Sequence, residues 1–483
     1  GDHRDLHYPL RRQRQMCIRD RYKGICSDSR IIKKGDIFFA IPGSNADGLK
    51  YVNDAVAKGA SAIVIPIKKK IKISSKIPIY KVKDIRKEIS LAAFVVNSET
   101  IEKKIAVTGT NGKTSVTYFL NYILSNLGEK TATIGTLGNS QIKKLNTENL
   151  TSPEPIDLSK QLRKLSKDKI KYLVMEASSH GLHQKRFYGL KFDACVLTNI
   201  SQDHLDYHKT MSHYIMSKLK LFSDYVKKDS KIIVNSETKY IDRVKSYLKK
   251  ESNISPIYFQ KNNKFKIVKI KKNKYNSTIV DVKFGKELKK FKFANFPLFQ
   301  IHNFLLATLT LYSMGHNLTK IQKLSLKCPS VPGRMEFVGN TRNSASVYID
   351  FAHTPDALQN ALIEGGNLCK SELHVVFGCG GNRDYSKRPI MGKIASKYAD
   401  NVVITDDNPR FENAKKIRKE IIDDCKNFLE ISDRRKAIKH AIKQLRKGDL
   451  LIIAGKGHEK NQIINGKAYP FDDVKISKGF LKL

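Results

Sequence analysis

Short apolar runs alternate with stretches of helical spacing along most of the chain, and polar residues follow most of the runs. On the N-terminal side, DIFFAI and SAIVI predict strands, and YVNDAVAKGA predicts a short helix between them. A longer helix is predicted in VKDIRKEISLAAFVV. This pattern indicates a small α/β domain at residues 22–98.

Residues 99–328 repeat the pattern on a larger scale. The runs KIAVTG, IKYLVME, FDACVLTNI and SKIIVN predict buried strands. After the first of them, apolar residues recur on one helix face, namely Val116, Phe119, Leu120, Ile123, Leu124 and Leu127. Gly128 follows as a C-terminal cap. We expect a mostly parallel sheet with helices on both faces.

Two prolines and a glycine in CPSVPGR (328–334) predict a domain boundary. Beyond it, SVYIDFA, ELHVVFG, NVVITDD and DLLIIAG each run from apolar residues into a polar loop. This predicts a second doubly wound, Rossmann-like domain at residues 329–483. The expected fold class is therefore α/β with three domains: a small N-terminal domain, a central phosphate-loop domain and a C-terminal Rossmann-like domain.

Composition is that of an ordinary globular protein. Of 483 residues, 40% are hydrophobic, and no apolar run approaches the roughly 18–20 residues that span a bilayer. The seven cysteines are odd in number and lack C-x-x-C spacing, which argues against a disulfide framework or a cysteine zinc site. We expect a cytoplasmic protein without membrane insertion.

Residues 1–21 are rich in arginine, whereas the rest of the chain prefers lysine. The segment also lacks the apolar core of a signal peptide. We interpret it as a non-native or disordered leader, with a flexible basic arm as the alternative.

The formal net charge of +43 has two interpretations. Clustered lysine and arginine would indicate a nucleic-acid binder, whereas diffuse lysine enrichment would help to gather small anionic substrates. The basic groups KKK (68–70), KKNK (271–274) and KKIRK (415–419) are far apart in the sequence, and no nucleic-acid motif accompanies them. This favours small anionic substrates and no nucleic-acid partner.

Polar clusters follow the predicted strands in both larger domains. They are TGTNGKTS, EASSHGL, TNISQDHLDYH, DFAHTPDAL, GCGGNRDYSKRP, TDDNPR and AGKGHE. Ligands of open parallel sheets bind beyond the carboxyl ends of the strands. The sequence therefore predicts an active surface on each of these two domains.

The loop IAVTGTNGKTSV differs from the usual phosphate-loop pattern, because Val107 stands where the first glycine is expected. The loop can still bind a phosphate, because Gly109 and Gly112 let backbone N–H groups approach it. Lys113 supplies a positive charge, and Thr114 offers a hydroxyl to Mg²⁺ at a helix N-terminus. The alternative is a glycine turn with a solvated lysine.

Glu176 ends a predicted strand and His204 follows another, and together with Thr114 they would suit a Mg²⁺ site. Taken alone, His204 is more typical of a hydrogen-bonded structural histidine.

GTNGKTS, EASSHGL, NISQDHLDYH, the HN at 302–303, the GRME at 333–336 and DFAHTPDAL together resemble the Mur ligase family of ATP-dependent amide-forming enzymes. The resemblance extends from about Tyr22 to the C-terminus. Within the family, DSR (28–30), GSNADG (43–48), GCGGNRD, DNPR (407–410) and GKGHE (455–459) resemble the branch that adds a diamino acid to UDP-N-acetylmuramoyl-L-alanyl-D-glutamate.

The resemblance implies that ATP phosphorylates a substrate carboxylate and that an amine then displaces phosphate. The implied catalytic residues are Lys113, Lys218 and His204, with Mg²⁺ held by Thr114, Glu176, His204 and Lys218, the lysine as a carbamate. From composition alone, Lys218 would be a surface helix lysine. The implied ATP-binding residues are Gly109, Thr110, Asn111, Gly112, Lys113, Thr114, Ser115, Asn303, Arg334 and Asp350.

For the UDP-sugar peptide, the family positions correspond to Ser29, Ser44, Asn45, Thr151, Ser152, Ser178, Gln184 and Arg186. Ser44 replaces a larger polar residue that several family members carry, and Ser152 replaces a threonine. We expect the hydroxyl contact to be retained at Ser152 and not at Ser44.

For the amino acid, the implied residues are Arg388, Asp407, Asn408, Arg410, Gly455 and Glu459. In this family DNPR accompanies meso-diaminopimelate, whose second carboxylate can pair with Arg410 bidentately, and Glu459 can accept the distal ammonium. As a bare tetrapeptide, DNPR would be a proline turn with a solvated arginine.

Four alternatives stay open at this point. They are a lysine-adding ligase, another Mur or folylpolyglutamate-type ligase, a catalytically dead scaffold and a basic nucleic-acid-binding ATPase. We expect a monomer acting on small-molecule substrates.

Overall fold

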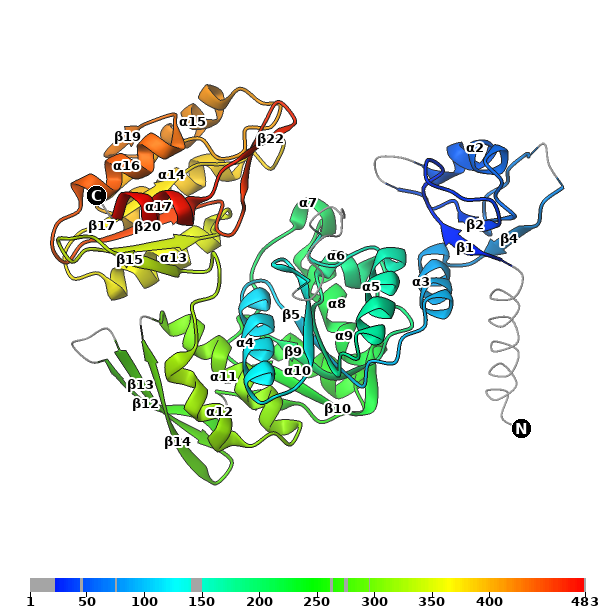
Figure 1. Ribbon diagram of the computed structural model, residues 1–483, viewed down its shortest axis with the longest axis horizontal. Helices are drawn as coiled ribbons and strands as arrows, with labels where there is room; N and C mark the ends of the chain where they lie inside the picture. Colours follow the sequence, from blue (N-terminus) through cyan, green and yellow to red (C-terminus); the bar gives the residue numbers. More distant parts are fainter. Residues whose placement is uncertain are drawn as a thin grey trace.

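The computed structural model describes residues 22–43, 47–73, 76–139, 150–260, 264–272, 277–294 and 296–481, except for the side chains of Asn139 and Asp206. The predicted leader, residues 1–21, therefore lies outside the described residues. Three α/β regions follow one another along the chain, and the central region lies between the other two (Figure 1). Within the described part, none of the helices combines the length and apolar character needed to cross a bilayer.

The N-terminal region is a four-stranded parallel sheet in the order β1-β2-β3-β4. The helix α3 contributes Ile89 and Ala93 to one face of its core, and then leads toward the central region (Figure 1). The elements are β1 (Gly24–Cys26), β2 (Asp36–Phe39), η1 (Gly48–Tyr51), α2 (Val52–Ala57), β3 (Ala62–Pro66), β4 (Ile79–Val82) and α3 (Ile85–Val96).

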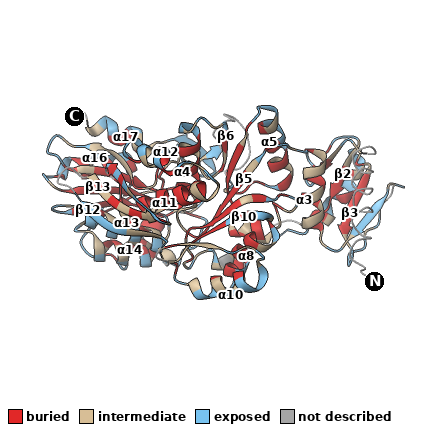
Figure 2. Cartoon of the chain, turned by 90° about the horizontal axis from the view of Figure 1, so that it is seen from below, coloured by how far each residue is buried: buried red, intermediate tan, exposed pale blue. Residues whose placement is uncertain are grey.

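The central region contains a seven-stranded sheet in the order β11-β10-β9-β5-β8-β6-β7, parallel except for β6–β7. Its strands are β5 (Lys103–Thr108), β6 (Thr131–Gly135), β7 (Gly138–Asn139), β8 (Tyr172–Glu176), β9 (Phe192–Leu197), β10 (Val226–Asn235) and β11 (Ile257–Phe259). Its helices are α4 (Lys113–Asn126), α5 (Pro155–Lys167), α6 (Ser179–His183), α7 (Leu205–His208), α8 (Met211–Leu219), α9 (Leu221–Asp224) and α10 (Ile241–Glu251). The innermost strands are buried on both faces (Figure 2), which explains their continuous apolar runs.

The helix α4 begins and ends as its sequence predicts. All six apolar residues of its predicted face except Leu127 are fully buried. At its C-terminus, Gly128 has φ +86°, its N–H donates to the Ser125 carbonyl, and the Glu129 N–H donates to the Leu124 carbonyl. This pair of bonds is the Schellman arrangement, which favours glycine at the left-handed position.

A three-stranded antiparallel sheet, β12-β13-β14, packs on the central region through α11 and α12. Its inner face buries alternate residues such as Val280, Val282 and Phe291, while lysines cover much of the outer face. The elements are β12 (Phe265–Lys272), β13 (Ser277–Phe284), β14 (Glu287–Ala294), α11 (Leu298–Ser313), α12 (Leu318–Leu324) and η2 (Ser325–Lys327).

The C-terminal region is a six-stranded sheet in the order β15-β16-β20-β17-β18-β19, with only β15 antiparallel. Its elements are β15 (Glu336–Asn340), β16 (Ser346–Asp350), α13 (Pro355–Leu368), β17 (Leu373–Phe377), α14 (Lys387–Tyr398), β18 (Asn401–Ile404), α15 (Ala414–Ile422), β19 (Phe428–Glu430), α16 (Arg434–Gln444), β20 (Leu450–Ala454), β21 (Asn461–Ile464), β22 (Lys467–Pro470) and α17 (Asp473–Leu481). The strands named from apolar runs are all present, and each parallel strand delivers its polar loop to the same sheet edge.

Candidate active site

The loop between β5 and α4 has the close backbone packing of a phosphate loop. A Cβ atom on Gly109 would lie 1.9 Å from the Thr198 hydroxyl, so only glycine fits there. Gly112 has φ +82° and precedes the first turn of α4, whose free N–H groups face the loop. The Asn111 N–H donates to Asn199 Oδ1 at 2.9 Å, which fixes the loop against the end of β9. The missing glycine at Val107 is explained because Val107 lies within β5.

Two lysine ammonium groups converge on this loop. Lys113 Nζ donates to the carbonyls of Gly109 (2.9 Å) and Thr110 (2.8 Å). Lys218 Nζ donates to the same Gly109 carbonyl at 2.7 Å and lies 4.5 Å from the centre of the Tyr214 ring. Burial lowers the pKa of both amines, and for Lys218 the nearby Lys113 charge lowers it further, well below its usual range. Lys218 is 1% exposed, so the expectation of a surface lysine from composition alone does not describe it.

Glu176, at the end of β8, supplies a carboxylate next to the phosphate loop. It is 1% exposed, and its Oε2 accepts hydrogen bonds from the hydroxyls of Thr114 (3.1 Å) and Thr136 (3.2 Å). Its Oε1 accepts the Thr136 N–H at 2.8 Å. A Cβ on Gly135 would lie 2.4 Å from that oxygen, which explains the glycine. A buried carboxylate beside a threonine hydroxyl is an oxygen donor set that suits Mg²⁺.

His204 lies at the edge of this group. Its side chain is 46% exposed, its Nε2 is 3.3 Å from Asp203 Oδ2, and its backbone has φ +53°. Its ring is 4.7 Å from the ring of His180 and 6.4 Å from that of Tyr214. The Tyr214 ring is therefore near both His204 and Lys218.

The C-terminal region reaches the phosphate loop through Arg334. Arg334 Nη2 lies 3.4 Å from the Thr114 hydroxyl, and its guanidinium stacks 4.7 Å from the centre of the Phe351 ring. Asp350, at the end of β16, accepts the Met335 N–H at 2.7 Å, and burial raises the pKa of its carboxyl to about 6. Asn303, on α11, approaches the loop so closely that a Cβ on Gly112 would lie 2.8 Å from its Oδ1. The structure thus brings the predicted ATP residues of two regions together.

The residues assigned to the UDP-sugar peptide form two groups. Ser152 is buried, donates to the Glu176 carbonyl (3.0 Å) and accepts the Ser178 N–H (3.0 Å). Arg186 donates to the Ser152 carbonyl at 2.6 Å and to Gln184 Oε1. Thr151 lies 3.2 Å from the Thr136 hydroxyl, next to Glu176.

Ser29 lies apart from that group, in the N-terminal region, and is 6% exposed. Beside it, a cavity of about 610 Å³ lies between the N-terminal and central regions, lined by Asp28, Arg86, Lys160 and Gln184 among others. Ser44 and Asn45 are outside the described residues.

The DNPR loop follows β18 and is held by the hairpin β21–β22. Asn408 Oδ1 accepts hydrogen bonds from Lys456 Nζ and from the Ile463 N–H, both at 2.9 Å. Asn408 Nδ2 donates to Glu459 Oε2 at 2.9 Å. Gly455 has φ +111°, and a Cβ there would lie 2.5 Å from Asp407 Oδ2. These assigned residues therefore form one cluster.

Arg410 and Arg388 differ in how much of each guanidinium is engaged. Arg410 has φ +55°, and Nη1 donates to the carbonyls of Gly381 (2.9 Å) and Asn408 (3.4 Å). Arg388 is 1% exposed and forms ion pairs with Glu412 (2.8 Å) and Glu420 (2.7 Å). Arg410 is therefore the better candidate for a direct substrate contact, and Arg388 holds the loop.

Sequence reasoning missed three residues of this site. Lys456 is fully buried between Asn408 and Glu459, and His458 hydrogen-bonds the backbone of Thr136, next to Glu176. Lys456 and His458 belong to the quoted GKGHE motif, which was the available signal. No pattern marked Thr136.

His208 provides a pH-dependent element beside the site. It is 1% exposed, and burial, followed by the charges of His180 and His213, lowers the pKa of its imidazole from 6.5 to about 3. Folded His208 stays neutral while the unfolded chain binds a proton, so this contribution to stability is present above pH 6.5 and is lost as the pH falls toward 3. We expect His208→Gln to flatten the decline of Tm between pH 7 and pH 5. Calorimetry at several pH values measures this, and parallel declines would contradict it.

Three domain models of Mur ligases match this chain in succession. They are the Mur ligase family catalytic domain at residues 21–103, the Mur ligase middle domain at 107–311 and the Mur ligase glutamate ligase domain at 333–457. The protein belongs to the Mur ligase family. This confirms the resemblance and the three-domain α/β fold class; the domain boundaries at 98 and 328 stay predictions.

Individual relatives cover nearly the whole chain. A protein of Rickettsia prowazekii named UDP-N-acetylmuramoyl-L-alanyl-D-glutamate–2,6-diaminopimelate ligase is 40% identical over 475 residues, 97% of each chain. A solved structure of a ligase with the same name has a TM-score of 0.68 at 28% identity and covers 95% of each chain. A MurF ligase from Thermotoga maritima, solved in complex with ADP, shares the fold with a TM-score of 0.58 at 16% identity, covering 95% of this chain and 97% of its own.

Proposed function

We propose that this protein is an ATP-dependent ligase that adds meso-2,6-diaminopimelate to UDP-N-acetylmuramoyl-L-alanyl-D-glutamate, a step in peptidoglycan precursor synthesis. The observation that carries the proposal is the contact of Arg334 with Thr114. It joins the carboxyl edge of the C-terminal sheet, which carries the DNPR cluster, to the phosphate loop of the central sheet. The named relatives support the same reaction.

The chemistry requires two displacements. The D-glutamate side-chain carboxylate attacks the γ-phosphorus of ATP, forming a C–O–P linkage as the bond to the β-phosphate oxygen breaks and ADP leaves. The diaminopimelate amine then attacks the acyl carbon, the amide forms, and inorganic phosphate leaves as the amine loses a proton. Both steps concentrate negative charge, so the site must be positive and already ordered.

The chain's own groups supply that environment. Lys113 and the N–H groups of the loop face the phosphates, with Arg334 adding a second cation from the opposite side. Asn303 and Asp350 would contact the nucleoside. His204, on the outer edge, would take part in charge neutralisation beside Lys218.

Mg²⁺ is part of the proposal. Thr114, Glu176, His204 and the carbamate of Lys218 would hold it, and Mg²⁺ would supply charge compensation for the phosphate oxygens. The fit of Mg²⁺ to these residues rests on the Glu176 oxygens, which are buried and accept hydrogen bonds from hydroxyl and N–H donors. It also rests on the lowered pKa of Lys218, because the neutral amine is the form that reacts with CO₂.

The UDP-sugar peptide would lie between the N-terminal and central regions. Ser29 and the 610 Å³ cavity would take the nucleotide end, and Ser44 and Asn45 are assigned to the same end. Thr151, Ser152, Ser178, Gln184 and Arg186 would place the peptide end beside Glu176. The bonds of Ser152 to Glu176 and Ser178 support a positioning role for its hydroxyl.

Diaminopimelate would bind at the DNPR cluster. Arg410 would pair with the distal carboxylate, and Asn408 and Glu459 with the distal ammonium. Lys456 would hold both of these side chains in place. Asp407, Gly455 and Arg388 would shape the cluster.

We expect Arg410→Lys to raise the KM for diaminopimelate by about tenfold or more, because an ammonium cannot replace a bidentate guanidinium. The KM for ATP should not change, since Arg410 does not touch the phosphate loop. Steady-state kinetics with each substrate varied in turn gives both values. Arg383→Lys, a nearby arginine outside the tetrad, is the control. An unchanged KM for diaminopimelate would remove Arg410 from the site.

The experiment that tests the function is phosphate release from ATP with UDP-N-acetylmuramoyl-L-alanyl-D-glutamate and Mg²⁺, adding meso-diaminopimelate or L-lysine in parallel. Release with diaminopimelate alone supports the proposal. Release with lysine alone would keep the ligase chemistry and overturn the specificity, and release with neither would overturn both.

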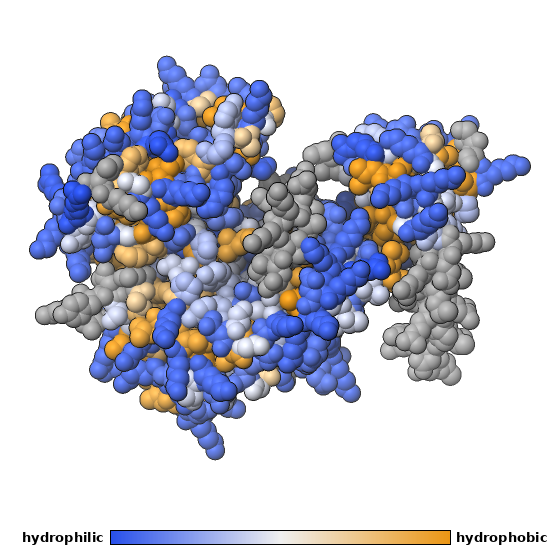
Figure 3. All heavy atoms as spheres, in the orientation of Figure 1, coloured by the Kyte–Doolittle hydropathy of each residue, from blue (hydrophilic) through white to orange (hydrophobic). Residues whose placement is uncertain are grey.

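The proposal also includes a cytoplasmic monomer without a nucleic-acid partner. Lysines are spread over the surface of the described residues, and hydrophilic residues dominate the face in Figure 3. Size-exclusion chromatography with light scattering tests the monomer, and a filter-binding assay at physiological salt tests the absence of nucleic-acid binding.

A further inference from the structure

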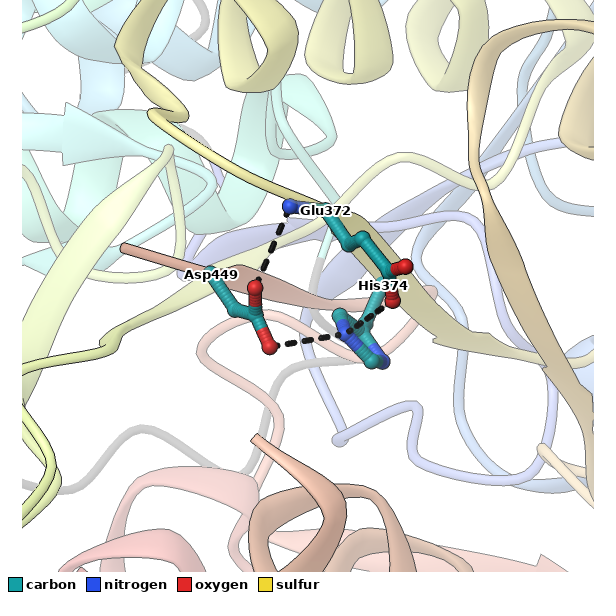
Figure 4. A group of neighbouring side chains, drawn as sticks. All are labelled: Glu372, His374 and Asp449. Atoms are coloured by element: carbon teal, nitrogen blue, oxygen red, sulfur yellow. Dashed lines mark hydrogen bonds and ion pairs between the residues drawn. The ribbon is translucent and has the colours of Figure 1, made fainter. Parts of the chain in front are cut away.

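Glu372, His374 and Asp449 form a compact group of donor atoms in the C-terminal sheet (Figure 4). Glu372 and His374 flank the start of β17, and Asp449 immediately precedes β20, the parallel neighbour of β17. One donor atom from each residue lies within 4.8 Å of the other two. Because the group is at the amino ends of these strands, it lies on the sheet edge opposite to the DNPR cluster.

His374 has a buried ring nitrogen that is available to bind a cation. The residue is 7% exposed, and its Nε2 has no hydrogen-bond partner among the described residues. The same nitrogen faces Asp449 Oδ2 at 3.3 Å and Glu372 Oε2 at 3.9 Å. A buried polar atom without a hydrogen bond is costly. A neutral imidazole that donates its lone pair to a cation between these carboxylates would remove that cost.

The two carboxylates are oriented by hydrogen bonds from backbone N–H groups and from one side-chain amide. Asp449 Oδ1 accepts the Glu372 N–H at 3.1 Å, and Oδ2 accepts the Arg446 N–H at 2.7 Å. Asn401 Nδ2 donates to Glu372 Oε2 at 2.9 Å. Outer hydrogen bonds of this kind hold metal ligands in their binding orientation. Glu372 is exposed, so solvent and ions reach the group from its side.

The separations suit a tetrahedral transition-metal ion. Zinc–ligand bonds of about 2.0–2.2 Å at tetrahedral angles place neighbouring donor atoms roughly 3.3–3.6 Å apart. The separation between His374 and Asp449 falls in this range, and the Glu372 side chain is exposed, so it can move to join them. An imidazole with two carboxylates favours zinc over magnesium, which prefers oxygen ligands in an octahedral arrangement.

We propose that Glu372, His374 and Asp449 bind one divalent transition-metal ion, best matched by Zn²⁺, with a water molecule as the fourth ligand. The ion ties the starts of β17 and β20 together and stabilises the C-terminal region. This site is separate from the Mg²⁺ site of the proposed ligase reaction and does not depend on that reaction.

The test is a Co²⁺ titration of the untagged full chain followed by visible absorption, with excess Mg²⁺ present to occupy oxygen-ligand sites. Co²⁺ in a tetrahedral site absorbs strongly, and Zn²⁺ should displace it. We expect one such ion per chain in the wild type and at least about tenfold weaker binding in Glu372→Gln and His374→Gln. His440→Gln, which removes an imidazole elsewhere in the C-terminal region, should bind as the wild type does.

Thermal unfolding supplies a second readout that is independent of activity. Because Glu372 is exposed, Glu372→Gln should have the metal-free Tm of the wild type, and it remains informative even if His374→Gln does not fold. Zn²⁺ should raise the Tm of the wild type and not that of Glu372→Gln. A wild type without a zinc-displaceable Co²⁺ band, or variants that keep both the band and the Tm shift, would overturn the proposal.

Discussion

Lys113→Met is expected to lower kcat by about 10²–10³-fold, the loss found when a single preorganised charge or donor is removed from a transition-state site. Methionine keeps the unbranched shape of the side chain but removes the ammonium group. That group donates to the Gly109 carbonyl, and the Glu176 charge attracts it. Phosphate oxygens would replace the loop carbonyls as its partners. The loss should fall mainly on kcat, because charge on the γ-phosphate is redistributed in the transition state.

Two controls separate chemistry from folding in this variant. Lys164→Met removes an exposed lysine of α5 and should keep full activity. Calorimetric titration with the UDP-linked dipeptide should give the same affinity for Lys113→Met as for the wild type, because Lys113 is not one of the residues assigned to that substrate. A Lys113→Met enzyme with at least half of the wild-type kcat would exclude Lys113 from the reaction.

The strands of both large sheets could be predicted because their physical environment is simple. A central parallel strand is buried on both faces, so β8 and β20 consist almost entirely of apolar residues. The antiparallel sheet β12-β13-β14 was missed for the opposite reason. Its outer face is rich in lysine, and the alternation of Val280 and Val282 with polar residues in STIVDVKF was masked by the charge.

The candidate site could be predicted as far as it follows from strand ends. Glu176 is the last residue of β8, and Lys113 and Asn408 follow β5 and β18 by a few residues, so their approximate place follows from the topology. Contacts between loops do not follow in this way. The bond of His458 to Thr136 and the contact of Arg334 with Thr114 depend on how two sheets pack together, and no local pattern encodes that distance.

Lys218→Ala is expected to lower kcat by about 10²-fold, and small carboxylates such as formate or acetate should restore part of the activity. The amine lies buried at the Gly109 carbonyl, and burial together with Lys113 lowers its pKa well below the usual range. The lowered pKa favours the neutral amine, which would attack CO₂, form an N–C bond and release a proton. The carbamate would place a negative charge near Lys113 and would offset the positive charge of that ammonium group.

The rescue distinguishes a carbamate from a lysine that only packs. Formate can enter the space left by the shortened side chain and supply the missing carboxylate oxygens, whereas chloride at equal ionic strength cannot. Lys220→Ala, two residues further on at the C-terminal cap of α8, should be fully active and insensitive to formate. ¹³C NMR of protein equilibrated with labelled bicarbonate should show a carbamate carbon in the wild type and none in Lys218→Ala. An unchanged kcat in Lys218→Ala would leave Lys218 as a packing residue beneath the loop. So would a loss of kcat that formate does not relieve, if the wild type also shows no labelled carbamate carbon.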